Sequence, residues 1–148
     1  MTSTIHTSFS LPVLRLGSIG SDVTLVQRLL NNAGYGLLVE DGIFGSRTET
    51  AVKQFQNDQN LTVDGVVGSL TWKALLPETI RRGSIGNDVE RLQIILNEIG
   101  YGSLVIDGIF GSNTEEAVKN LQKDVHLEVD GIVGSLTWYI LLIDRIKD

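Results

Sequence analysis

The feature that most constrains this chain is a duplication of nearly its whole length at a fixed offset. Gly17 corresponds to Gly83 and Trp72 corresponds to Trp138, in both cases 66 positions apart (83 − 17 = 138 − 72 = 66). Roughly two-thirds of the aligned positions are identical, and no insertion separates the matches. Because self-similarity of this kind marks a repeated structural unit, whatever fold the first copy adopts, the second should adopt as well.

A short motif occurs in both copies. It reads DGIFGSRT at residues 41–48 and DGIFGSNT at residues 107–114, and the weaker forms DGVVGSLT and DGIVGSLT occur later in each copy. Glycine relaxes the steric limits on the backbone, and aspartate closes a turn through its own side chain. Small polar residues can then meet the first unpaired amides of a helix. The motif therefore predicts a loop that leads into a helix.

Apolar residues at helical spacing predict three helices in each copy. The fold class is thus all-α, with two tandem three-helix bundles joined by a short linker. We expect a flexible tail at residues 1–10, a first domain at 11–76 and a second domain at 77–148. Pro77 ends the last helix of the first copy, whereas the second copy has no proline there, so its last helix should run longer.

Local signals give finer expectations. Ser46 and Glu49 stand three apart as in a capping box, which predicts a reciprocal cap on the second helix. Gly34 and Gly100 should form the left-handed ends of the first helix in each copy. The apolar segment at residues 37–42 should dip towards the core. Four positions become more apolar in the second copy: Arg28 is Ile94, Glu40 is Ile106, Lys73 is Tyr139 and Ala74 is Ile140. These replacements indicate either extra buried surface in the second copy or scattered surface residues.

Composition excludes several classes of function. The net charge of -6 and the isoelectric point near 4.8 disfavour non-specific binding to nucleic acid or to anionic membranes, which needs cations to displace counterions. The chain has no cysteine, so a disulfide, a thiolate metal site and a thiol nucleophile are all impossible. No apolar run reaches the roughly 18 residues of a membrane span, so no membrane insertion is expected. The polar opening residues 1–10 do not read as a secretory signal peptide.

The spaced motifs together resemble a known family. The string GSxGxDVxxLQxxLN, followed by DGxFGxxTxxAVxxFQ and then LxVDGxVGxxTW, is similar to the peptidoglycan-binding domains found beside bacterial and phage cell-wall hydrolases. Both copies match along their length, with Leu121 replacing the aromatic seen at Phe55 and Val26 replacing the leucine seen at Leu92. The resemblance implies non-catalytic attachment to peptidoglycan and a location in the cell envelope or outside the cell.

Peptidoglycan offers apolar sugar faces, amides and charged stem peptides, so its site should combine an exposed aromatic ring with fixed polar groups. Some of the candidates also have structural explanations: the phenylalanines can fill the core, the aspartates can close turns, and the glutamines can bond loop backbone. We expect Trp72 and Trp138 to anchor the core of their copies in the same way as the phenylalanines. Arg47 is Asn113 in the second copy, so if this loop holds a stem carboxylate, the first copy should bind it better. The ligand-binding candidates are Tyr35, Asp41, Phe44, Arg47, Gln56, Tyr101, Asp107, Phe110, Asn113 and Gln122.

Catalysis finds little support in the sequence. His6 lies in the polar tail and His126 aligns with Asn60, so no paired histidines could hold a catalytic zinc ion. The glutamates that could form a glycosidase pair are explained by helix ends and solvated surfaces. We therefore expect no enzyme activity, no metal and no cofactor. Two alternatives remain: a scaffold that docks a separately encoded wall hydrolase or phage component, and a cell-wall hydrolase.

Overall fold

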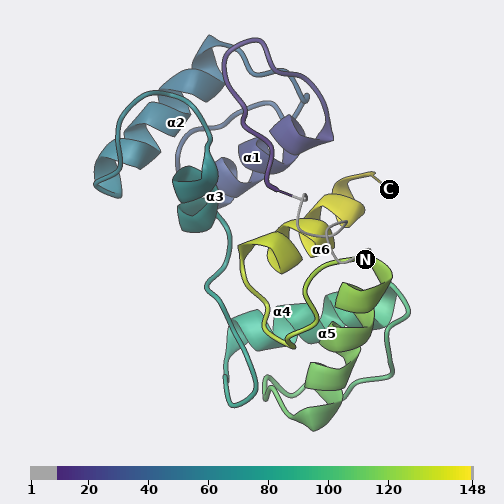
Figure 1. The fold of residues 1–148 in the computed structure, drawn as a ribbon. Helices are drawn as coiled ribbons and strands as arrows, with labels where there is room; N and C mark the ends of the chain where they lie inside the picture. The colour runs from purple at the N-terminus through teal and green to yellow at the C-terminus, as the bar shows by residue number, and fades with distance from the viewer. Residues whose placement is uncertain (1–9, 148) are drawn as a thin grey trace. The chain divides into compact units, whose positions relative to one another are not determined.

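A computed structural model describes residues 10–147, and the tail predicted at residues 1–10 falls outside that range except for Ser10. Six helices and no strand occur in the described part, which confirms the all-α fold (Figure 1). Four isolated β-bridges pair loop residues. The helices are α1 (Ser21–Asn32), α2 (Ser46–Asp58), α3 (Ser69–Leu75), α4 (Asn87–Glu98), α5 (Ser112–Asp124) and α6 (Ser135–Lys147).

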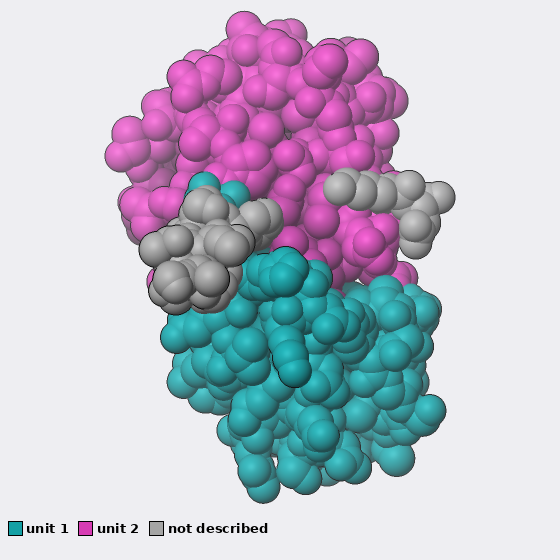
Figure 2. Space-filling model, turned by 45° about the vertical axis from the view of Figure 1, so that its right-hand side comes forward, with its two compact units in different colours: residues 1–10, 78–138 teal, residues 11–77, 139–148 magenta. Residues whose placement is uncertain are grey.

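The chain forms two compact units (Figure 2). Unit 1 contains Glu78–Trp138, and unit 2 contains Leu11–Pro77 together with the chain from Tyr139 onward. The domain limits of 11–76 and 77–148 correspond to the repeat and stay a prediction. α6 has 13 residues whereas α3, its counterpart, has 7.

A tryptophan occupies the centre of each unit. Trp72 of unit 2 and Trp138 of unit 1 are both fully buried, as the sequence predicts for core aromatics. Each indole N–H donates to a backbone carbonyl that lies 60 positions earlier in the chain: Trp72 to Pro12 at 2.7 Å and Trp138 to Glu78 at 2.9 Å. Because a buried indole N–H needs a partner, these bonds fasten the incoming chain of each repeat to its last helix.

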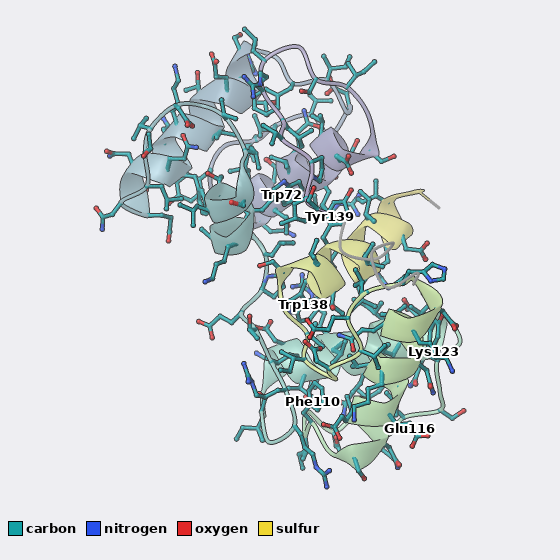
Figure 3. The ribbon with its side chains drawn as sticks, in the orientation of Figure 1. Trp72, Phe110, Glu116, Lys123, Trp138 and Tyr139 are labelled. Carbon is teal, nitrogen blue, oxygen red and sulfur yellow. The ribbon has the colours of Figure 1, made fainter. Side chains whose placement is uncertain are left out.

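Tyr139 completes the core of unit 2. Its ring packs edge-on against Trp72, with centroids 5.4 Å apart, and its hydroxyl donates to Asp22 (Figure 3). Burial and then the bond to Asp22 raise the pKa of the Tyr139 hydroxyl. Of the apolar replacements in the second copy, this one is buried, whereas Ile94 and Ile106 are exposed. The replacements therefore do not mark one continuous buried face.

Backbone groups, and not side chains, form the end of α1 and the start of α2. The Gly34 N–H bonds the carbonyl of Asn31 and the Tyr35 N–H bonds that of Leu30, which is the predicted left-handed ending, with Gly34 at φ 91°. The predicted capping box at Ser46 and Glu49 is wrong: Gly45 is the N-cap of α2, and no side chain caps that helix. Ser46 is already the first helical residue, so its side chain stands past the capping position.

The segment at residues 37–42 does not dip towards the core as expected. Leu37 and Val39 are exposed, at 95% and 72% of their surfaces, while Leu38 is half-buried. Two hydrogen bonds between the Asn31 side chain and the backbone of Leu38 hold this segment: Asn31 donates to the carbonyl and accepts from the N–H. The apolar character of this segment therefore does not reflect burial, and Leu37 stays open to solvent.

His126 occupies a left-handed backbone position at φ 64°, directly after the C-cap of α5. Asn60 holds the same place in the first repeat at φ 60°. Asparagine tolerates this region better than most residues, because its short side chain bonds locally.

We expect His126→Asn to raise the free energy of unfolding by about 0.5–1 kcal/mol, since it relieves backbone strain at an exposed site. Urea unfolding followed by circular dichroism would measure it. The matched control is Asn60→His, which should lower the stability by a similar amount. Equal stabilities of all three proteins would contradict the strain argument.

Candidate ligand-binding site

A buried glutamine holds each of the loops that precede α2, α3, α5 and α6. In unit 2, the amide nitrogen of Gln56 lies 3.0 Å from Asp64 Oδ1, 2.9 Å from the Val66 carbonyl and 3.0 Å from Thr71 Oγ1. The oxygen of Gln56 accepts from the backbone N–H groups of Asp64 and Gly65. This confirms that the glutamines bond loop groups. The arrangement, which we call the glutamine clamp, occurs four times, at Gln27, Gln56, Gln93 and Gln122.

The aspartate of each clamp closes its own turn. Asp41 Oδ1 accepts from the backbone N–H of Ile43 at 3.0 Å and also lies 3.2 Å from the amide nitrogen of Gln27. The bond from the backbone and the bond from the glutamine hold the pKa of Asp41 below its usual value. The pKa values of Asp64 and Asp107 are lowered in the same way, in each case with the backbone bond as the largest cause.

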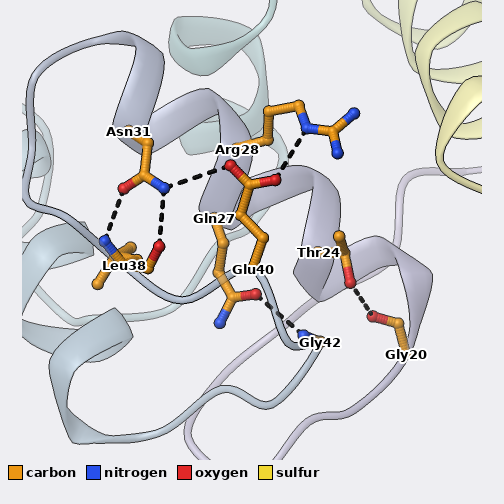
Figure 4. A network of polar contacts seen from close by, with 8 residues as sticks. All are labelled: Gly20, Thr24, Gln27, Arg28, Asn31, Leu38, Glu40 and Gly42. Carbon is orange, nitrogen blue, oxygen red and sulfur yellow. Dashed lines mark hydrogen bonds and ion pairs between the residues drawn. The ribbon is translucent and has the colours of Figure 1, made fainter.

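An asparagine fixes the loop after α1. The side chain of Asn31 donates to the carbonyl of Leu38 at 2.9 Å and accepts from its N–H at 2.8 Å (Figure 4). Asn31 also bonds Glu40, which pairs with Arg28 at 3.0 Å. Asn97 holds Leu104 in the same way in unit 1. These bonds place residues 36–40, of which only Leu38 is half-buried and the others are exposed.

A pocket of about 280 Å³ lies between this loop and α2 in unit 2. It combines an aromatic ring, two leucines, polar side chains and one arginine. The Tyr35 ring packs edge-on against Phe55 at 5.3 Å, and its hydroxyl donates to Asp58 at 2.7 Å, so the ring is held in a fixed orientation. The lining residues are Tyr35, Gly36, Leu37, Leu38, Ser46, Arg47, Thr50, Ala51 and Gln54.

Of the candidates in the first repeat, the structure brings two to this pocket, Tyr35 and Arg47. Phe44 and Gln56 are buried with 1% of their surface exposed, and Asp41 is engaged in its turn.

The second repeat shows the same distribution. Phe110 and Gln122 are buried with 1% of their surface exposed, and Asp107 closes its turn. The Tyr101 hydroxyl donates to Asp124 at 2.7 Å, and Asn113 is exposed on α5.

Sequence reasoning missed several residues that form or support the pocket. Leu37, Thr50 and Gln54 line it, but none belongs to a motif that carries recognisable chemistry. Asn31 supports it, and here a signal existed, because an asparagine ends the LQxxLN string in the second copy and its equivalent in the first. An amide in the last turn of a helix, with exposed apolar residues after it, is well placed to bond the returning backbone.

The described residues contain no group of three or more His, Cys, Asp or Glu side chains that could hold a metal ion. Within the same part of the chain, none of the helices has the length and apolar character needed to cross a membrane.

The fold defines a class: small all-α modules, each held together by glutamine clamps, with a pocket of mixed polarity beside α2 in unit 2. The family model described as "Putative peptidoglycan binding domain" matches residues 19–75 and 85–141. The chain therefore belongs to this family and carries two tandem peptidoglycan-binding domains, as the motifs predicted.

Relatives of known identity are longer proteins. The N-acetylmuramoyl-L-alanine amidase CwlM of Mycobacterium tuberculosis is 31% identical over 145 residues, which cover 84% of this chain and 36% of that protein. The spore cortex-lytic enzyme of Bacillus subtilis is 38% identical over 84 residues, or 56% of this chain and 28% of the enzyme. The chain thus spans about a third of the length of these relatives. Among solved structures, the SleB N-terminal domain is 36% identical, with a TM-score of 0.44, and the match covers 47% of this chain and 93% of that domain.

Replacing a clamp glutamine should destabilise its unit strongly. We expect Gln56→Leu to lower the free energy of unfolding by about 2–4 kcal/mol, because two loop N–H groups and a buried threonine lose their partner. Chemical denaturation would measure the change. Gln54→Leu, an exposed position on the same helix, is the control and should change stability by less than about 0.5 kcal/mol. A loss of the same small size for both variants would contradict the clamp's role.

The lowered pKa values of three clamp aspartates predict that the protein loses stability in acid. Because the pKa values of Asp41, Asp64 and Asp107 are lower in the folded protein than the usual 3.8, these three carboxylates stabilise the fold fully above that value and lose this effect as the pH falls towards the folded pKa. The urea midpoint should therefore fall below about pH 4. In the triple variant Asp41→Asn, Asp64→Asn, Asp107→Asn, the acid-induced fall should be shallower, whereas an unchanged slope would show that these carboxyls do not contribute.

Proposed function

We propose that this chain attaches non-catalytically to peptidoglycan through both of its domains. The observation that carries the proposal is the pocket beside α2, which offers a fixed tyrosine ring and exposed apolar surface next to an arginine and neutral polar side chains. Sugar rings with N-acetyl groups have apolar faces that suit such surfaces, and their amides suit the polar groups. Membership of the family supports the same ligand.

The absence of activity is part of the proposal. The relatives named as amidases and cortex-lytic enzymes are longer than this chain, and the region they share with it corresponds to its binding domains. The carboxylates of Asp41, Asp64 and Asp107 are engaged in closing turns, which supports a structural role for them. A wall hydrolase as partner, and a place in the cell envelope or outside the cell, belong to this proposal as well.

Duplication would supply affinity that one open pocket lacks. Linking two sites makes the second binding event intramolecular, and this can raise apparent affinity by about 100-fold to 10,000-fold when both sites reach the polymer together. A polymer with many repeated units offers sites of that kind, whereas a single soluble fragment engages one domain at a time. Binding to intact wall should thus be much tighter than binding to small fragments.

We expect the pure chain to sediment with purified peptidoglycan sacculi and Leu37→Ser to weaken this binding about fivefold to tenfold. The change removes a leucine contact of the order of 1 kcal/mol from the pocket and introduces the residue found at the equivalent position, Ser103. The bound fraction against sacculus concentration is the measurement.

Leu70→Ser is the matched control, because Leu70 is 68% exposed and lies outside the pocket. Equal loss in both variants would show that the pocket is not the contact. No sedimentation of the unaltered chain, with recovery of a stoichiometric protein partner from a pull-down instead, would favour the docking scaffold. A cleared band in a zymogram would establish a hydrolase.

A further inference from the structure

The two repeats differ in charge at the positions that line the pocket. In the first repeat these positions carry one formal charge, the cation of Arg47, and the remaining lining residues are neutral. In the second repeat, the positions 66 residues later include Ser103 for Leu37, Asn113 for Arg47 and Glu116 for Thr50. One positive charge has become one negative charge, while the surrounding tyrosine, glycine and alanine are retained.

The arginine is available to a ligand. Arg28 pairs with Glu40, and Arg82 pairs with Glu115 at 3.5 Å, but in the described part of the chain Arg47 has no such partner. A guanidinium group binds a carboxylate through two parallel hydrogen bonds, and such charge-assisted bonds are stronger than neutral ones. On a protein with a net charge of -6, Arg47 thus places a positive charge beside the apolar side chains of this pocket.

The second repeat has the opposite character. Glu116 is exposed on α5 (Figure 3), one helical turn from Asn113. An exposed carboxylate at this place repels the carboxylate of a ligand. The second repeat has no arginine here to offset this repulsion, because Asn113 stands where the first repeat has Arg47. The retained aromatic and amide groups can still contact neutral parts of a ligand, so the difference concerns charge rather than the presence of a surface.

We propose that the first repeat selects a peptide carboxylate through Arg47 and that the second repeat, with Asn113 in place of Arg47 and Glu116 in place of Thr50, rejects it. The two domains then recognise different parts of one polymer: the first requires a stem peptide that keeps a free carboxylate, and the second contacts neutral or amine-bearing parts. This rests on the proposed attachment to peptidoglycan and adds the chemical group that each domain requires.

Nuclear magnetic resonance titration of the full chain tests the proposal. The probes are an N-acetylated alanine dipeptide with a free terminal carboxylate and the same dipeptide as its terminal amide. We expect the acid to shift backbone amide signals at residues 35–38 and 46–54, with affinity at least about fivefold higher than that of the amide at low salt. Residues 101–104 and 112–120 should show no preference for the acid.

Variants that exchange the charged residues between the two repeats test whether these residues set the preference for the acid. Arg47→Asn installs the residue of the second repeat and should abolish the preference for the acid. The double variant Asn113→Arg, Glu116→Thr should create that preference in the second repeat. Lys53→Asn is the matched control, because it removes one positive charge from the same helix outside the pocket and should leave the preference intact.

Each other outcome overturns the proposal. Equal binding of acid and amide would remove the charge requirement, and equal effects of Arg47→Asn and Lys53→Asn would reduce it to general electrostatics. An absence of shifts with either dipeptide would exclude the peptide carboxylate as ligand. If the chain still sediments with sacculi in those cases, the proposed function stands without this selectivity, so the two failures are distinguishable.

Discussion

The rest of this structure depends on the pairing of a buried primary amide. An amide side chain has two donor hydrogens and an acceptor oxygen, and burying them without partners costs more than a small core can offset. In the glutamine clamp every one of these groups meets a loop: Gln56 joins an aspartate, a glycine N–H, a carbonyl and the threonine of the next helix. Four clamps therefore bring the loops that precede α2, α3, α5 and α6 to defined positions.

Because the glutamine clamps hold the loops, the residues that stabilise the fold differ from the residues that form the surface. Because the clamps bond backbone and buried groups, the outward side chains of the same loops and helices contribute little to folding. Leu37 and Arg47 in one repeat can become Ser103 and Asn113 in the other while the Asn31 and Asn97 bonds beneath them are retained. A duplicated unit built like this can change what it binds without changing its fold.

Periodicity and burial made several features predictable from the sequence alone: the helices, the tryptophan cores, the left-handed glycine ends and the glutamines that bond loops. The predictions that failed concerned sequence patterns that are compatible with more than one backbone conformation. Serine and glutamate three apart resemble a capping box, but a preceding glycine took the N-cap and moved Ser46 into the helix. The apolar run at residues 37–42 resembles a buried segment, yet its position is set by the Asn31 amide. The pocket depends on that loop, so most of its lining was beyond prediction.

The difference in charge between the two repeats affects how the tandem protein gains affinity for a polymer. A single open pocket that binds with a millimolar dissociation constant supplies only about 4 kcal/mol. Two identical sites would gain by tethering wherever a ligand recurs, but sites of opposite charge gain only where their different groups occur at the spacing the chain can reach. If Arg47 holds a carboxylate and Glu116 excludes one, tight binding requires both kinds of group on the same polymer. The second repeat then adds discrimination between wall chemistries as well as strength, which identical copies could not provide.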